Sequence, residues 1–244
     1  MAQKGKALRA VIAAALGASL LGLPAHAACR QALAMGLDVS GSVDLREYRL
    51  QLDGLITALN HPDVVAALLA APDAPVSLLV FEWSGPVDPS VLVPWTPINN
   101  AAALQNISET LATTSRRDTS PGTALGEAMM LGAQYLDQQS DCWKRTLDIS
   151  GDGRSNSGPR PRDVKQAIDA RGITINALVI GADTQTSDRD QQSDIAELSS
   201  YFAAEVITGP DAFVQVSLGY EAYAEAMTAK LKRELDGMAI GRLQ

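Results

Sequence analysis

Three short segments of the chain carry carboxylate and hydroxyl side chains next to apolar runs. Asp38, Ser40 and Ser42 alternate in the first segment. Thr123 stands at the start of a helical pattern in the second, and Asp152 follows an apolar run in the third. Oxygen ligands of this kind suit Mg²⁺, Mn²⁺ or Ca²⁺ and would hold zinc poorly. Together the three segments predict a divalent-metal site.

Each of these segments also has an ordinary structural interpretation. Short runs of Ser, Gly and Asp form turns, Thr123 could cap a helix, and Asp152 could begin a turn. Electrostatics favours a metal over a bound phosphate, because Asp38 and Asp152 would repel an anion at the same place. Two carboxylates that face each other are costly unless a cation neutralises them. We therefore expect a divalent cation at this place.

The elements that would position these segments alternate between strands and helices. Continuous apolar runs are typical of strands that are covered on both faces of a parallel sheet. The best strand candidates are Ala32–Val39, Pro75–Phe81, Trp143–Ile149 and Ile173–Ile180, with a short edge strand over Val91–Trp95. The pattern predicts an α/β fold with a doubly wound, mostly parallel sheet flanked by helices. In such sheets, binding sites form beyond the carboxyl ends of the strands.

Apolar residues at helical spacing lie between these strands. The first helix is expected from Leu45 to Leu59, after a capping box formed by Asp44 and Glu47. The remaining helices are expected over Ala101–Leu111, Thr123–Leu136, Asp163–Ala170 and, as a long final helix, Tyr220–Leu235. The acidic stretch from Asp183 to Asp194 is interpreted as a solvated loop, with Ca²⁺ binding as the alternative.

The first 27 residues have the layout of a secretory signal peptide. Three basic residues precede an apolar run from Ala10 to Leu23, and small residues stand before a predicted cleavage point after Ala27. The run is shorter than the roughly 20 residues that a membrane helix needs, and an uncleaved anchor is the alternative. Cys29 offers a lipoprotein alternative, which His26 disfavours because such signals have an aliphatic residue there. We predict a single exported domain, residues 28–244, in the periplasm or the medium.

The charge balance argues against nucleic acids and anionic membranes as partners. The whole chain has 20 basic and 28 acidic side chains and a formal net charge of −8. Removal of the three basic residues of the leader would bring the charge to −11. Phosphate backbones and anionic lipids repel a domain this acidic.

The order of the three segments resembles the von Willebrand factor A (vWA) domain and its metal-ion-dependent adhesion site (MIDAS). The shared features are D-x-S-x-S, a threonine in P-G-T-x-L-G and an aspartate in S-G-D-G. The similarity covers essentially the whole mature chain. Residues 80–85, 149–153 and 209–213 are most similar to a group of exported bacterial vWA-like proteins designated DUF1194.

This resemblance implies a metal-dependent protein-binding module without catalytic residues. In the family, hydroxyls at the positions of Ser40, Ser42 and Thr123 coordinate the ion directly or through water. Carboxylates at the positions of Asp38 and Asp152 act mostly through bound waters. The family metal is usually Mg²⁺, with Mn²⁺ or Ca²⁺ as alternatives here, and a partner's Glu or Asp commonly completes the coordination. Many relatives have Gly-Gly-Thr where this chain has Ser-Pro-Gly-Thr before its metal-ligand position.

The two cysteines precede the strands that end at Asp38 and Asp152. In the family's sheet these strands are neighbours, and strands in a sheet lie about 4.8 Å apart, a separation that a disulfide can span. The resemblance therefore predicts a disulfide between Cys29 and Cys142, with two buried free thiols as the alternative.

The alternative function is an Mg²⁺-dependent phosphohydrolase of the haloacid-dehalogenase type that uses Asp38 and Asp152. Such enzymes have a second aspartate where this chain has Ser40, which argues against this function. A serine hydrolase fits less well, because the sequence has no G-x-S-x-G and His61 is the one histidine after the leader.

Two residues after the second predicted strand are candidates for the rim of the metal site. Glu82 and Trp83 follow the apolar run there. Trp83 and Trp95 suit a role as packing anchors equally well.

Overall fold

The domain is built on a six-stranded sheet with the strand order β3-β2-β1-β4-β5-β6. The computed structural model describes residues 29–86, 89–181 and 188–236, so the predicted signal peptide lies outside the described residues. β3 is antiparallel to β2, and the other pairs are parallel. The strands are β1 (Gln31–Asp38), β2 (Val76–Trp83), β3 (Ser90–Ile98), β4 (Lys144–Gly151), β5 (Thr174–Ile180) and β6 (Val214–Ser217). This confirms the predicted α/β fold with a mostly parallel sheet.

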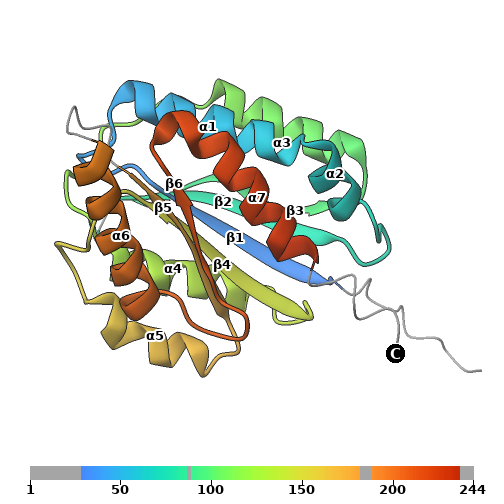
Figure 1. Cartoon of the computed structure of the whole chain (residues 1–244). Helices are drawn as coiled ribbons and strands as arrows, with labels where there is room; N and C mark the ends of the chain where they lie inside the picture. Colours follow the sequence, from blue (N-terminus) through green and yellow to red (C-terminus); the bar gives the residue numbers. More distant parts are fainter. Residues whose placement is uncertain (1–28, 87–88, 182–187, 237–244) are drawn as a thin grey trace, which may run out of the picture.

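Helices cover both faces of the sheet (Figure 1). The helices are α1 (Leu45–Leu59), α2 (Pro62–Leu68), α3 (Ala101–Thr113), α4 (Leu125–Asp137), α5 (Pro161–Asp169), α6 (Asp188–Glu205) and α7 (Tyr223–Asp236), with a 3₁₀ turn η1 (Tyr220–Ala222). Within the described residues, no helix is both long enough and apolar enough to cross a membrane.

Alternate residues of the central strands point to opposite sides of the sheet. Leu33, Met35 and Leu37 of β1 join a core with α1, α2, α3 and α7. Ala32 and Ala34 join a second core with α4, α5 and α6. Because both faces are covered, β1 and β2 are mostly apolar along their length, whereas β4 also carries buried polar side chains.

Local signals set the start of α1 directly after the D-x-S-x-S segment. The Glu47 amide donates to Asp44 Oδ1 at 2.8 Å, and the Asp44 amide donates to Glu47 Oε2 at 2.8 Å. This reciprocal capping box satisfies two backbone donors and fixes where the chain turns from loop into helix.

Helix α4 begins at Leu125, two residues later than predicted, because the backbone of Ala124 (φ −95°, ψ 62°) is not helical, and the amides before it are bonded to other parts of the chain. The Thr123 amide donates to Asn156 Oδ1 at 2.9 Å, and the Ala124 amide donates to the Ser84 carbonyl at 2.7 Å. The N-terminus of α4 has no side-chain cap, so Thr123 does not act as its capping residue.

The prediction of an acidic loop from Asp183 to Asp194 is wrong for residues 188–194, which begin α6, and residues 183–187 lie outside the described part. Leu198 and Phe202 lie four residues apart, at helical spacing, and pack on the second core. The polar residues before them concealed this pattern. Helix α2, capped by the His61 side chain at the Asp63 amide, and strand β6 were also not predicted.

A disulfide joins Cys29 and Cys142, whose Cα atoms are 4.4 Å apart. Both residues lie just before β1 and β4, which pair in parallel from Gln31 opposite Lys144. The predicted pairing of the cysteines is therefore present in the structure. It ties two neighbouring strands together at the sheet edge opposite the D-x-S-x-S turn.

Replacement of both cysteines by serine should lower the free energy of unfolding by about 4 kcal/mol, because the bond closes a loop of more than a hundred residues in the unfolded chain. Urea unfolding without reductant measures this, and wild-type protein in dithiothreitol is the matched control. Equal stability of wild-type protein and the double serine variant without reductant would contradict the prediction, as would alkylation of both thiols in the native, unreduced wild-type chain.

Candidate metal centre

The D-x-S-x-S turn meets Asp152 at the carboxyl ends of β1 and β4. The Ser40 amide donates to Asp38 Oδ1 at 2.8 Å, which folds the turn back on the end of β1. The Ser40 and Ser42 hydroxyls are 3.2 Å apart, and the Ser42 hydroxyl donates to Asp152 Oδ1 at 2.8 Å. Four of the five predicted metal ligands are thus connected through direct polar contacts.

Thr123 reaches the same edge on the segment between α3 and α4. The Gly41 amide donates to the Pro121 carbonyl at 3.2 Å, so this segment borders the D-x-S-x-S turn through its backbone. Thr123 is 6% exposed, and its hydroxyl lies 3.5 Å from Asn156 Nδ2. Asn156 also accepts from the Thr123 amide, and sequence reasoning missed this supporting residue, which stands in a run of Ser, Asn and Gly typical of a loop.

The two carboxylates lie in surroundings that disfavour negative charge. Asp38 is fully buried, and its Oδ2 atom has no hydrogen-bond partner. Burial, and secondly the charge of Asp152, raise the pKa of Asp38 to about 7. Burial also raises the pKa of Asp152, although that carboxylate accepts hydrogen bonds from Ser42 and, at 3.3 Å, from Tyr220. Among the described residues, no Lys, Arg or His side chain forms an ion pair with either aspartate.

This donor set fits a hard divalent cation. A cation beside Asp38 Oδ2 would satisfy an atom that now has no partner, and it would offset the repulsion between the two carboxylates. No group of three or more His, Cys, Asp or Glu side chains suited to a metal occurs in the part of the chain that the structure describes. Hydroxyl groups and waters would therefore have to complete the coordination, which suits Mg²⁺.

Glu82 and Trp83 lie behind this site and not on an exposed rim. Both are almost fully buried, with exposed fractions of 1% and 2%. Glu82 accepts a hydrogen bond from the Tyr48 hydroxyl at 2.6 Å and lies 3.5 Å from Arg117 Nε. Trp83 packs in the core beside α4, and Trp95 is partly buried against the same core.

The chain belongs to the DUF1194 family, described as "Protein of unknown function (DUF1194)", whose profile matches residues 28–239. This confirms the family that residues 80–85, 149–153 and 209–213 indicated. A search of curated protein sequences finds no match.

Solved structures with the same fold include vWA domains. Proximal thread matrix protein 1 from the mussel byssus superposes with a TM-score of 0.58 at 15% identity, over 85% of this chain and 48% of that one. The von Willebrand factor type A protein from Catenulispora acidiphila gives 0.57 at 15%, over 85% and 43%. BatB from Bacteroides thetaiotaomicron gives 0.53 at 14%, over 86% and 98%. The chain thus spans about half the length of the mussel and Catenulispora proteins, and these low identities establish the fold alone.

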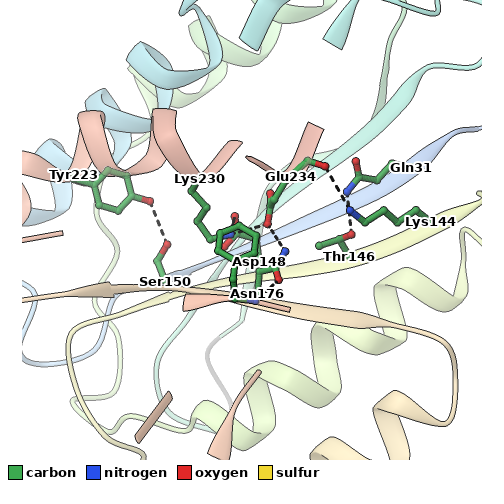
Figure 2. Close-up of polar contacts among 10 residues, drawn as sticks. Gln31, Lys144, Thr146, Asp148, Ser150, Asn176, Tyr223, Lys230 and Glu234 are labelled. Carbon is green, nitrogen blue, oxygen red and sulfur yellow. Dashed lines mark hydrogen bonds and ion pairs between the residues drawn. The ribbon is translucent and has the colours of Figure 1, made fainter. Parts of the chain in front are cut away.

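The 3₁₀ turn η1 and the start of α7 contact the end of β4 and Asp152. Tyr220, in the 3₁₀ turn before α7, donates to Asp152 at 3.3 Å. The Tyr223 hydroxyl at the start of α7 lies 3.3 Å from the Ser150 hydroxyl on β4 (Figure 2). The position of Asp152 therefore depends on how α7 is seated.

A buried ionic cluster seats α7 on the sheet (Figure 2). Lys230 Nζ lies 2.6 Å from Asp148 Oδ2 on β4 and 2.7 Å from Glu234 Oε1. Asn176 on β5 donates to the same Glu234 oxygen at 2.7 Å. All four side chains are at most 2% exposed. This cluster was not predicted from the sequence, although Lys230 and Glu234 lie four residues apart on the apolar face of α7.

One lysine faces two carboxylates in this cluster, so one carboxyl group tends to keep its proton. Burial raises the pKa of Asp148 to about 7, a net value that includes the opposing charge of Lys230 and a smaller upward contribution from Glu234. Because the folded pKa lies above the ordinary value of about 4, the stabilising contribution is fully present below pH ~4 and is lost as the pH rises through about 7.

Asp148→Asn should therefore flatten the pH dependence of stability. Between pH 5 and pH 8 we expect wild-type protein to lose about 2 kcal/mol more unfolding free energy than the variant. Urea unfolding in EDTA at several pH values measures the difference, and the titration of Asp38 cancels because both proteins share it. Parallel pH profiles for the two proteins would contradict the assignment.

Proposed function

We propose that this domain is an exported, metal-dependent protein-binding module of the adhesion type. A divalent cation, Mg²⁺ in the first place and Mn²⁺ or Ca²⁺ as alternatives, would be held by Asp38, Ser40, Ser42, Thr123 and Asp152. A carboxylate from a partner protein would complete its coordination. The observation that best supports this is the buried Asp38 carboxylate, which has an unpartnered oxygen and a second carboxylate, Asp152, close enough to raise its pKa.

The chemistry of the ligands explains why such a site would bind an acidic side chain. Mg²⁺ requires near-octahedral oxygen coordination and keeps waters where protein ligands are few. Three of the five proposed ligands are neutral hydroxyls, so the bound ion would retain much of its positive charge. An incoming Asp or Glu could then replace a water and gain a strong charge interaction. The mussel protein has been solved with a zinc-occupied MIDAS motif, which supports a cation at this position of the fold.

The site is better suited to binding than to catalysis. A phosphohydrolase of the haloacid-dehalogenase type would need a general acid at residue 40, and here a serine hydroxyl lies beside Ser42 instead. An assay for phosphatase activity with Mg²⁺ separates the two functions, and turnover that requires Asp38 would favour the enzyme.

Export is part of the proposal. The signal-like leader would direct residues 28–244 to the periplasm or the medium. The Cys29–Cys142 disulfide supports an oxidising compartment, since such bonds are rare in the bacterial cytosol.

Asp38→Ala should abolish metal binding without unfolding the domain, because it removes a proposed ligand and a buried charge together. Saturating Mg²⁺ at about 100 times its dissociation constant should stabilise wild-type protein by about 2.7 kcal/mol, and this increment should vanish in the variant. Titration calorimetry and thermal unfolding in Mg²⁺ and in EDTA measure both effects. Asp73→Ala removes an exposed carboxylate from another loop and is the control. A wild-type protein that binds neither Mg²⁺, Mn²⁺ nor Ca²⁺ would refute the metal site.

Partner binding should depend on the same ion. Immobilised wild-type protein should retain a partner from the native envelope fraction in Mg²⁺, release it in EDTA, and lose it when Asp38 is replaced. High salt should weaken the contact, since a charge interaction dominates it. Retention that is unchanged by excess chelator would contradict metal-dependent binding.

A further inference from the structure

An arginine in the segment between α3 and α4 forms hydrogen bonds with the backbone of the D-x-S-x-S turn. Arg116 Nη2 donates to the carbonyl of Val39 at 3.2 Å and to the carbonyl of Ser40 at 3.3 Å. These two carbonyls belong to the D-x-S-x-S turn. The same segment carries Thr123, so Arg116 links two of the three parts of the proposed site.

Two more contacts reinforce this link. The Thr119 hydroxyl donates to the Val39 carbonyl at 2.9 Å, and the Gly41 amide donates to the Pro121 carbonyl at 3.2 Å. The segment from Arg116 to Pro121 therefore holds the turn on both its carbonyl and its amide side. A shift of either part relative to the other would break several hydrogen bonds at once.

The hydrogen bonds from Arg116 and Thr119 occupy backbone carbonyls that could otherwise coordinate a metal ion. A carbonyl oxygen is itself a good ligand for a hard cation. The carbonyls of Val39 and Ser40 are engaged by Arg116 and Thr119, which leaves the side-chain oxygens of Asp38, Ser40 and Ser42 to face an ion. Their positions relative to Thr123 then depend on how firmly Arg116 holds the two segments together.

Arg116 forms no ion pair within the described part of the chain. Among the described residues it pairs with no carboxylate, whereas Arg117 lies beside Glu82 and Arg49 lies beside Asp53. Its Nε atom is buried without a hydrogen-bond partner. An unneutralised cation close to a cation site would by itself weaken metal binding. The role of Arg116 at this place is therefore better explained by its hydrogen bonds to the turn than by its charge.

We infer that Arg116 is a positioning residue that sets the metal affinity of the site. It holds the Thr123 segment in register with the D-x-S-x-S turn, so that the ligands of both are in place before the ion arrives. This inference rests on the proposed function, since it assumes that these residues bind a divalent cation.

The experiment compares the Mg²⁺ affinity of wild-type protein with those of Arg116→Ala, Arg116→Lys and Arg49→Ala. Arg49 is the matched control, because it also donates to two backbone carbonyls, those of Leu111 and Thr114, but away from the metal turn. Titration calorimetry gives the affinity, and unfolding in EDTA reports any loss of stability that is independent of metal. We expect Arg116→Ala to weaken Mg²⁺ binding about 10- to 100-fold, as loss of a residue that orients metal ligands typically does.

The sign of the effect separates positioning from electrostatics. Loss of a positive charge alone would tighten Mg²⁺ binding, whereas loss of positioning weakens it. Arg116→Lys should recover part of the affinity, because it keeps one donor, and Arg49→Ala should stay within about twofold of wild type. Unchanged or tighter binding by Arg116→Ala would overturn the inference, as would equal weakening by Arg49→Ala.

A second variant covers the case in which Arg116→Ala fails to fold. Thr119→Val removes one hydrogen bond to Val39 and leaves every charge in place. It should also weaken Mg²⁺ binding, by a smaller factor, and wild-type affinity in this variant would count against the inference. If wild-type protein itself binds no Mg²⁺, the proposed function fails first, and that result is distinct from a wild-type site that Arg116 does not influence.

Discussion

A buried carboxylate and a partly buried one, at the carboxyl ends of adjacent parallel strands, are the constraint on which the rest of this structure depends. β1 and β4 pair directly, so Asp38 and Asp152 come to the same edge of the sheet. Burial raises the pKa of both groups, and Asp38 retains an oxygen without a partner. Without a cation this arrangement costs free energy, and it becomes favourable when a divalent cation lies between the carboxylates.

The surrounding elements are arranged to keep this edge in place. The Cys29–Cys142 disulfide joins the same two strands at their opposite ends. The buried contacts of Lys230 with Asp148 and Glu234 hold α7 on the sheet. In the 3₁₀ turn before α7, the Tyr220 hydroxyl donates to Asp152. The site is thus fixed by strand pairing, by a covalent bond and by a helix that is itself anchored through buried charge.

The sequence was sufficient for those features that depend on local pattern. Apolar runs located the four central strands, and the Asp44–Glu47 capping box located the start of α1. The D-x-S-x-S turn and Asp152 could be assigned to one sheet edge because parallel strands end there together. The disulfide followed from the family resemblance, in which the strands that correspond to β1 and β4 are neighbours.

Features that depend on tertiary contacts escaped sequence reasoning. α6 begins in a polar run, and its apolar face is recognisable only against the second core. Lys230 and Asp148 are far apart in the chain, so their contact has no sequence signature. The same holds for Arg116 and Asn156, which contact the predicted ligands from loops whose conformation the sequence does not specify.

The most direct test of this account is a crystal structure of the wild-type domain grown with Mn²⁺, with anomalous scattering used to locate the metal. The account predicts an anomalous peak within coordination distance, direct or through one water, of Asp38, Ser40, Ser42, Thr123 and Asp152. The absence of a peak at this edge, with Mn²⁺ in excess and the five side chains well ordered, would contradict it.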